Sequence, residues 1–342
     1  MKSSLTWMQD YVDVDMNQDM QAFADKLTIA GIPVEQVEYW GTEVKKVKTG
    51  KILQIDKHPD ADKLVVCQVD MGDEQLQIVT AATNVRVGQI VPVAVHGAHL
   101  PGGTKIKRSK LRGVLSNGMF CSAHEFGFDD SLLLPEEREG IWILPPDTPL
   151  GVDAADYLQV RDVVYEYELT ANRADCQSVL GIAREVATVL NKPLKMPATD
   201  YTVSDYVDPR LSISVEAEDL CPRYIGHYVR NITPGESPRW MRRQLALCGL
   251  RSISNVVDIT NYVMLEIGQP MHAFDMDALE SCQILVRRAK DGEKITTLDE
   301  KEFTLTPNNL VICDGSKPVA LAGVMGGLNS EIKDTTTQLL FE

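Results

Sequence analysis

The segment from about residue 43 to 125 constrains the fold most, because short apolar stretches follow one another with turn residues between them. Five such stretches are Val44–Ile55, Leu64–Val69, Leu76–Val79, Ile90–Val95 and Lys105–Lys107. Glycine and proline clusters separate them, at Gly72-Asp73, Gly88 and Pro101-Gly102-Gly103. Gly, Pro and Asp are the residues that tight turns require. Several short strands at this spacing predict a β-barrel or a β-sandwich.

The flanking segments mix helical and extended patterns. A helix is expected over 17–31 and another over about 176–190, with a strand at 164–169 between them. A third unit begins near 210, with helices at 237–249 and 254–266; Ser237 is expected as an N-cap followed by a proline at the first helical position. Further strands are expected at 211–215, 224–229, 283–288, 294–305, 309–313 and 318–325. Residues 130–160 and 191–209 read as proline-containing connectors. A chain of 342 residues with this pattern predicts an α+β protein of two or three domains.

A local cluster of cations stands out against an acidic chain. The formal net charge is −15, yet five lysine and arginine residues lie between 105 and 112. Lys and Arg supply phosphate contacts that depend on salt and not on base sequence. Gly118-Met119-Phe120 offers an apolar platform for an unstacked base. The alternative is a solvated charged strand ending in a tight turn.

The cysteines and the hydropathy of the chain argue against several classes of protein. The seven cysteines contain no CxxC pair and are odd in number, which argues against a disulfide framework or a zinc site and favours a reducing cytoplasm. The first ten residues lack an apolar signal core, and no apolar run approaches the ~20 residues of a membrane span. We therefore expect a cytoplasmic protein without membrane contact.

A histidine in a loop of the third unit is the candidate for acid–base chemistry. His272 follows Pro270, and Asp275 is close enough in sequence to orient its ring. A histidine near its ordinary pKa can move a proton or hold a water molecule. A histidine that only stabilises the loop fits the residues equally well.

Three ordered motifs in the strand-rich segment resemble the tRNA-binding OB-fold module of synthetase-associated proteins. They are HPDADKL at 58–64, NVR-G at 84–88 and LRGV-S-GM-CS at 111–122. Ala81 and Ala82 stand where that family usually has a glycine. The resemblance implies an OB-fold barrel whose RNA-binding residues are Lys63, Asn84, Arg86, Lys105, Lys107, Arg108, Lys110, Arg112, Ser116 and Met119.

The flanks resemble the β subunit of bacterial phenylalanyl-tRNA synthetase. The matching segments are Trp7–Pro33, LTANRADC at 169–176 and SVLGIARE at 178–185. The resemblance implies three parts: a discontinuous small α+β domain (1–40 plus 150–200), an inserted OB-fold module (41–149) and an editing-type B3/B4-like α+β domain (201–342). The chain stops at 342 within an expected strand, which we interpret as truncation of a longer subunit.

The same resemblance implies an activity for the third unit. In this family it hydrolyses tyrosine wrongly attached to the phenylalanine tRNA. An apolar pocket rejects an added hydroxyl weakly, by ~10², so a second site that demands the hydroxyl is needed. Carried onto this chain, His272 would lie beside the ester or its water, Asn261 and Gly323 would line the pocket, and Glu342 would accept the tyrosine hydroxyl proton.

The resemblance also assigns the ligase chemistry and the partners. ATP-dependent, Mg²⁺-dependent attachment of phenylalanine lies on a partner α subunit in an (αβ)₂ heterotetramer, and this chain itself would hold no cofactor or metal. No Walker loop, dinucleotide fingerprint or Ser-His-Asp set is present in the sequence. Two other functions remain open: a non-catalytic tRNA-binding protein, and a free-standing hydrolase that edits in trans.

Overall fold

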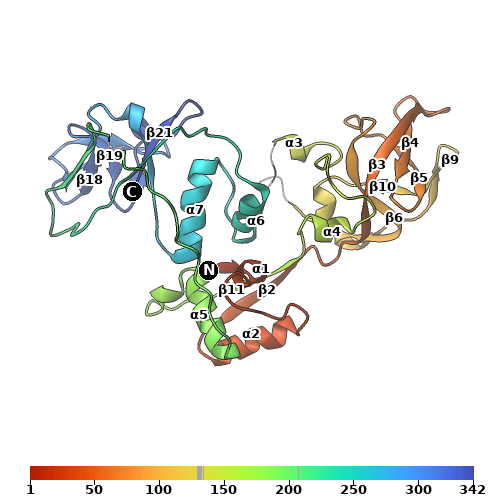
Figure 1. Cartoon of the computed structure of the whole chain (residues 1–342), viewed down its shortest axis with the longest axis horizontal. Coiled ribbons are helices and arrows are strands. Elements are labelled where there is room, and N and C mark those ends of the chain that lie inside the picture. Colours follow the sequence, from red (N-terminus) through yellow and green to blue (C-terminus); the bar gives the residue numbers. More distant parts are fainter. Residues whose placement is uncertain (129–132, 134, 207) are drawn as a thin grey trace. The chain divides into compact units, whose positions relative to one another are not determined.

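A computed structural model describes residues 1–128, 133, 135–206 and 208–342 of the chain (Figure 1). The chain forms two compact units: residues 1–169 with 189–192, and residues 170–188 with 193–342. Each unit combines helices with β-sheets, so the chain has a multidomain α+β fold. Within the described ranges, no helix has the length and hydropathy needed to cross a membrane.

The first unit contains a three-stranded antiparallel sheet built from distant segments. Its order is β1 (Lys2–Ser4), β11 (Asp162–Tyr167), β2 (Val34–Trp40), with the helices α1 (Leu5–Met8) and α2 (Met20–Ile29) between β1 and β2. Asp19 begins α2 by accepting the N–H groups of Gln21 and Ala22. The buried Tyr165 hydroxyl donates to the carbonyl oxygen of Met20 at 2.5 Å, which ties α2 to β11.

A larger antiparallel sheet follows in the same unit. Its order is β10-β6-β3-β4-β5, and β7 pairs with β6. The strands are β3 (Lys45–Lys57), β4 (Val65–Asp70), β5 (Gln75–Thr80), β6 (Ile90–Leu100), β7 (Thr104–Lys105) and β10 (Gly118–Phe120). Among the described residues no strand ladder joins β5 to β10, so the predicted barrel is seen as an open sheet. Hydrogen bonds nonetheless link β5 to 115–117, among them Asn117 N–H to the Gln77 carbonyl at 2.8 Å, Val79 N–H to the Ser116 hydroxyl at 3.0 Å, and the Gln77 amide to the Leu115 carbonyl at 2.6 Å.

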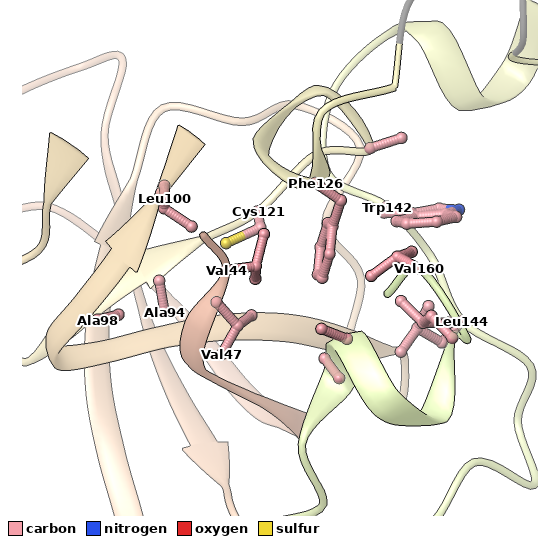
Figure 2. Packing of buried hydrophobic residues seen from close by; sticks show 14 of the residues in the cluster. Val44, Val47, Ala94, Ala98, Leu100, Cys121, Phe126, Trp142, Leu144 and Val160 are labelled. Carbon is pink, nitrogen blue, oxygen red and sulfur yellow. The ribbon is translucent and has the colours of Figure 1, made fainter. Parts of the chain in front are cut away.

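Apolar side chains cover both faces of this sheet. One cluster gathers Ile52, Val69, Ile78, Val93 and Phe120. Figure 2 shows the other, in which Val44, just before β3, and Val47 of β3 meet Phe126, Trp142 and Leu144 from the segment after the sheet. The rings of Phe126 and Trp142 pack edge to face, with their centroids 5.4 Å apart. Short helices complete this part: η1 (Pro101–Gly103), η2 (His124–Phe126), α3 (Pro135–Arg138) and α4 (Ala154–Tyr157).

The second unit holds two sheets that share one core. The larger has the order β12-β15-β18-β19-β20, with β12 and β15 parallel and the other pairs antiparallel, and the smaller has the order β13-β21-β14. The shared core contains Phe274, Ile284, Ile312, Val319 and Leu340. The strands are β12 (Ser212–Val215), β13 (His227–Arg230), β14 (Ala273–Asp275), β15 (Gln283–Arg288), β18 (Leu310–Cys313), β19 (Pro318–Leu321), β20 (Met325–Gly326) and β21 (Gln338–Phe341), with a separate hairpin of β16 (Lys294–Thr296) and β17 (Glu302–Thr304). The helices are η4 (Ala174–Cys176), α5 (Val179–Leu190), α6 (Arg239–Leu247), α7 (Asn255–Ile267), η5 (Met276–Ala278) and η6 (Leu328–Ser330).

Most predicted elements are present, and the differences have local causes. Ser237 does not cap α6: Pro238 holds the N-cap position, and the Ser237 hydroxyl donates to the buried carboxylate of Asp258. The strand expected at 294–305 is a hairpin, because Thr297 N–H turns back to the Lys301 carbonyl at 3.0 Å. The connectors expected at 130–160 and 191–209 fall partly outside the described residues.

Candidate functional site

A cationic hairpin follows β7 in the first unit. Strands β8 (Ser109–Leu111) and β9 (Val114–Ser116) pair antiparallel and are joined by the two residues Arg112 and Gly113. Both have positive φ, 45° and 88°, as a type I′ hairpin turn requires. Gly113 therefore serves the turn itself, and Arg112 lies at the hairpin tip.

Histidine 58 anchors this hairpin to the HPDADKL loop. Its Nε2 lies 2.9 Å from the carbonyl oxygen of Leu111, and its Nδ1 accepts the Asp60 N–H at 3.1 Å. Nε2 must carry the proton, because Nδ1 is an acceptor. The motifs at 58–64 and 111–122 are thus joined through a buried imidazole.

The cations of the hairpin region are exposed and unpaired. Lys105, Lys107, Arg108, Lys110 and Arg112 all face solvent, and none forms an ion pair with a carboxylate of the described ranges. Lys63 is likewise exposed, in the loop next to His58. Some cations elsewhere are paired, such as Arg287 with Glu293 at 2.7 Å. These exposed cations form a local positive surface on a chain of net charge −15, and positive charge of this kind attracts polyanions.

The remaining predicted RNA-binding residues make contacts inside the protein. The Asn84 amide donates to the Ile141 carbonyl at 2.8 Å and accepts the Ile141 N–H at 3.0 Å. Arg86 Nη1 donates to the carbonyls of Thr83 and Val85. Ser116 is buried, and its hydroxyl accepts from Val79 and donates to the Gly118 carbonyl. Met119 packs against the core cluster drawn in Figure 2.

A second candidate site lies in the other unit, where β14 begins and β21 ends. The two strands pair antiparallel, with Ala273 opposite Phe341. His272 and Glu342 extend this ladder by one pair: His272 N–H donates to the Glu342 carbonyl at 3.2 Å, and Glu342 N–H donates to the His272 carbonyl at 2.9 Å. The ladder therefore places two residues that are 70 positions apart directly opposite one another.

The ring of His272 is enclosed and lacks one hydrogen-bond partner. It packs edge to face on Phe274, with the ring centroids 4.8 Å apart. A Cβ atom on Gly326 would lie 2.4 Å from both Cε1 and Nε2, so the backbone of β20 closes over the ring. Nε2 is buried and has no hydrogen-bond partner among the described residues. Burial lowers the pKa of His272, which keeps the imidazole neutral near pH 7.

Glu342 is held by a residue that sequence reasoning missed. The Tyr224 hydroxyl donates to Oε2 of Glu342. Burial raises the pKa of the Glu342 carboxyl, and the hydrogen bond from Tyr224 opposes this rise. Burial also raises the pKa of Tyr224, so its hydroxyl stays protonated and remains a donor. No sequence signal pointed to Tyr224, which lies 118 positions from its partner.

The other predicted residues of this site make no hydrogen bond with His272 or Glu342 among the described residues. Asn261 is in the middle of α7, and its amide makes no hydrogen bond with a described residue. Gly323, with φ of 69°, follows β19, and nothing lies within 4 Å of a Cβ built on it. The expectation that Asp275 orients His272 is wrong: its carboxylate is buried and accepts from the Thr336 hydroxyl at 2.6 Å and from the Asp277 N–H at 2.9 Å.

One cluster has the donor types of a metal site. Asp175, Cys176 and Glu185 place their ligand atoms within 4.8 Å of one another. The Arg173 guanidinium already contacts all three, at 3.0 Å from Asp175, 3.0 Å from the Cys176 sulfur and 2.8 Å from Glu185. Burial raises the pKa of Cys176 to about 11, so the sulfur is a thiol and a poor ligand. The arginine supplies the positive charge that this cluster needs.

One segment in each unit matches a known protein family. Residues 47–153 match the family described as "Putative tRNA binding domain", and residues 220–342 match the family described as "B3/4 domain". Among solved structures, an N-terminal fragment of the phenylalanyl-tRNA synthetase beta-subunit from Pyrococcus horikoshii aligns with a TM-score of 0.30 and 16% identity, over 53% of this chain and 55% of that one. That similarity is too low to support an argument about the fold.

Curated relatives match the whole chain. The phenylalanine–tRNA ligase beta subunit of Syntrophus aciditrophicus is 49% identical over 344 residues, which cover 100% of this chain and 42% of that subunit. The beta subunit of Moorella thermoacetica is 52% identical over 343 residues, with the same coverage of 100% and 42%. The chain thus spans about 42% of the length of these relatives. At this identity over its full length, the chain belongs to the family of phenylalanine–tRNA ligase beta subunits.

Proposed function

We propose that this chain provides the tRNA-binding and editing parts of a phenylalanine–tRNA ligase. The whole enzyme attaches phenylalanine to its tRNA at the expense of ATP, and this part removes tyrosine attached in error. The His272–Glu342 pair carries the proposal, because it places a neutral imidazole and a partly buried carboxyl group side by side in the unit that matches the B3/4 family.

The two side chains suit hydrolysis of a tyrosyl ester. A neutral imidazole with a free Nε2 can accept a proton from an attacking water or hold that water against the ester carbon. An ionised Glu342 accepts hydrogen bonds but donates none, so it favours a substrate that carries a hydroxyl. Phenylalanine would leave Oε1 of this partly buried carboxylate unpaired, which costs about 1–3 kcal/mol. On the family resemblance, Asn261 and Gly323 complete the site.

The hairpin and its sheet support the RNA-binding part of the proposal. We propose that the open sheet is a small OB-fold barrel, in which the hydrogen bonds from 115–117 to β5 complete the closure. Lys105, Lys107, Arg108, Lys110, Arg112 and Lys63 then bind tRNA phosphates. Asn84, Ser116 and Met119 act indirectly by holding the loops, and Arg86 offers its remaining guanidinium nitrogens.

The domain division and the partners belong to the same proposal. The β1-β11-β2 sheet supports a discontinuous domain that joins residues 1–40 with the segment after 150. The module at 41–149 is then an insertion, and 201–342 is the editing-type domain. The chain would act in the cytoplasm with an α subunit, as an (αβ)₂ heterotetramer. On the family resemblance, ATP and Mg²⁺ would serve the full enzyme at the aminoacylation site of that partner.

A deacylation assay on the complete gene product tests the editing role. We expect His272→Ala to slow hydrolysis of tyrosyl-tRNA by about 10²-fold or more, the usual contribution of a positioned acid–base group. His227→Ala, an exposed histidine on β13, is the matched control and should leave the rate unchanged. Equal rates for His272→Ala and the wild type would remove the proposal.

Two other functions make different predictions for the same preparation. A non-catalytic tRNA-binding protein would bind tRNA without hydrolysing tyrosyl-tRNA. A free-standing editing hydrolase would hydrolyse it and would gain no aminoacylation activity when the α subunit is added. The wide match to ligase beta subunits favours the first proposal over both.

A further inference from the structure

We infer that Tyr224 is a specificity-determining positioning residue, whose hydroxyl occupies one oxygen of the Glu342 carboxylate and leaves the other oxygen for the hydroxyl of a tyrosyl substrate. This inference rests on the proposed editing function and names the group that sets its selectivity. It concerns a residue that acts through Glu342, and it does not require Tyr224 to touch the substrate.

The geometry fixes Glu342 from two directions. Its backbone is held by the reciprocal hydrogen bonds with His272, at 3.2 and 2.9 Å. Its side chain is held at Oε2 by the Tyr224 hydroxyl, and Tyr224 itself packs against the core that contains Phe274 and Leu340. The rotamer of Glu342 is therefore set by a phenol that the core anchors.

The second carboxylate oxygen stays available. Oε1 of Glu342 accepts no hydrogen bond from any residue of the described ranges. A carboxylate has room for about four donors, so it can accept a second hydroxyl without losing the first. A substrate phenol that donated to Oε1 would complete a symmetric arrangement of one carboxylate between two tyrosine hydroxyls.

The hydrogen bond from Tyr224 also favours the ionised form of Glu342, which is a pure acceptor. Burial favours the protonated carboxyl, which would donate its own proton and discriminate poorly between a hydroxyl and none. A donor on Oε2 favours the ionised form, which can only accept, and so opposes this effect of burial. Removal of the Tyr224 hydroxyl should weaken selection for tyrosine and leave the hydrolytic group, His272, in place.

The test compares two substrates in three proteins. kcat/KM is measured for tyrosyl-tRNA and phenylalanyl-tRNA with the complete gene product, its Tyr224→Phe variant and its Tyr228→Phe variant. Tyr228→Phe is the matched control, since it removes a phenol hydroxyl that donates to Gln338 at the far end of the same strand pair. We expect Tyr224→Phe to lower the ratio of the two kcat/KM values about tenfold, the value of one charged hydrogen bond, and Tyr228→Phe to keep the ratio.

A ratio unchanged in Tyr224→Phe, with the wild type active, would overturn the inference and leave the proposed function standing. A purely structural role would lower both kcat/KM values together, which also overturns it.

If the wild type hydrolyses neither ester, the proposed function fails, and the binding of tyrosinamide and phenylalaninamide then decides the role of Tyr224. A wild-type preference for tyrosinamide that disappears in Tyr224→Phe supports the inference, and no preference overturns it. Should Tyr224→Phe fold poorly, Glu342→Gln with Tyr224 retained must lower the same ratio.

Discussion

Gly326 lies directly against the ring of His272: a Cβ atom at this position would stand 2.4 Å from Cε1 and Nε2 of the imidazole. The backbone of β20 thus forms a wall that only glycine allows. The glycine expected from the family resemblance, Gly323, has open space around it instead. The close approach makes Gly326 a structural requirement for the position of the proposed acid–base group.

We predict that Gly326→Ala displaces the His272 ring. Overpacking of this kind costs about 1–3 kcal/mol of stability, and the rate of tyrosyl-tRNA hydrolysis should fall at least about tenfold because the imidazole leaves its place. Gly235→Ala is the control, since nothing lies within 4 Å of its added methyl group. Denaturant melts and the deacylation assay measure both effects. Full activity in Gly326→Ala would show that the ring position is not critical.

The buried His272 predicts a specific loss of stability in acid. Its pKa lies below the ordinary 6.5 because burial disfavours the imidazolium. At pH values between the folded-state pKa and the unfolded-state value of about 6.5, this histidine is protonated in the unfolded chain and neutral in the folded one. The free energy of unfolding therefore falls as the pH drops below about 6.5. The loss is complete once the pH is below the folded pKa.

His272→Gln should remove this part of the pH dependence. The slope of unfolding free energy against pH, measured by urea titration between pH 6.5 and 5, should be shallower in the variant than in the wild type. His227→Gln controls for loss of an exposed imidazole. Identical slopes in the wild type and His272→Gln would mean that His272 is not desolvated.

We predict that Asn84 contributes to the folding stability of the protein and makes no direct contact with RNA. Its amide makes two hydrogen bonds with the backbone of Ile141, and Asn84→Ala would leave that N–H and carbonyl unpaired. We expect a loss of about 1–3 kcal/mol in unfolding free energy, with the salt dependence of RNA binding unchanged. A changed salt dependence with unchanged stability would instead favour a direct RNA contact.

The features of the fold and of the candidate site that could be predicted from the sequence are those that depend on residues close together in the chain. Alternation and turn residues located β3, β4, β5 and the start of β6, since these signals are local. The motif around Asn84 was found, but its partner Ile141 was not, because no local pattern reports a contact 57 residues away. Tyr224 was missed for the same reason: its role appears only when β13, β21 and β14 are paired.

The cations of the β8–β9 hairpin should control the salt dependence of tRNA binding. They have no carboxylate partners among the described residues, so phosphate binding breaks no internal ion pair. Each phosphate contact adds about 0.7–0.9 to the slope of log K against log salt. Replacing Lys107, Lys110 and Arg112 with alanine should therefore reduce the slope by about 2 and weaken binding at low salt.

The control is Lys294→Ala with Lys301→Ala, two exposed lysines of the β16–β17 hairpin that pair with Glu302 and Asp299, each at 2.7 Å. Filter binding from 50 to 200 mM salt measures both, and equal slopes in the two variants would place the RNA elsewhere.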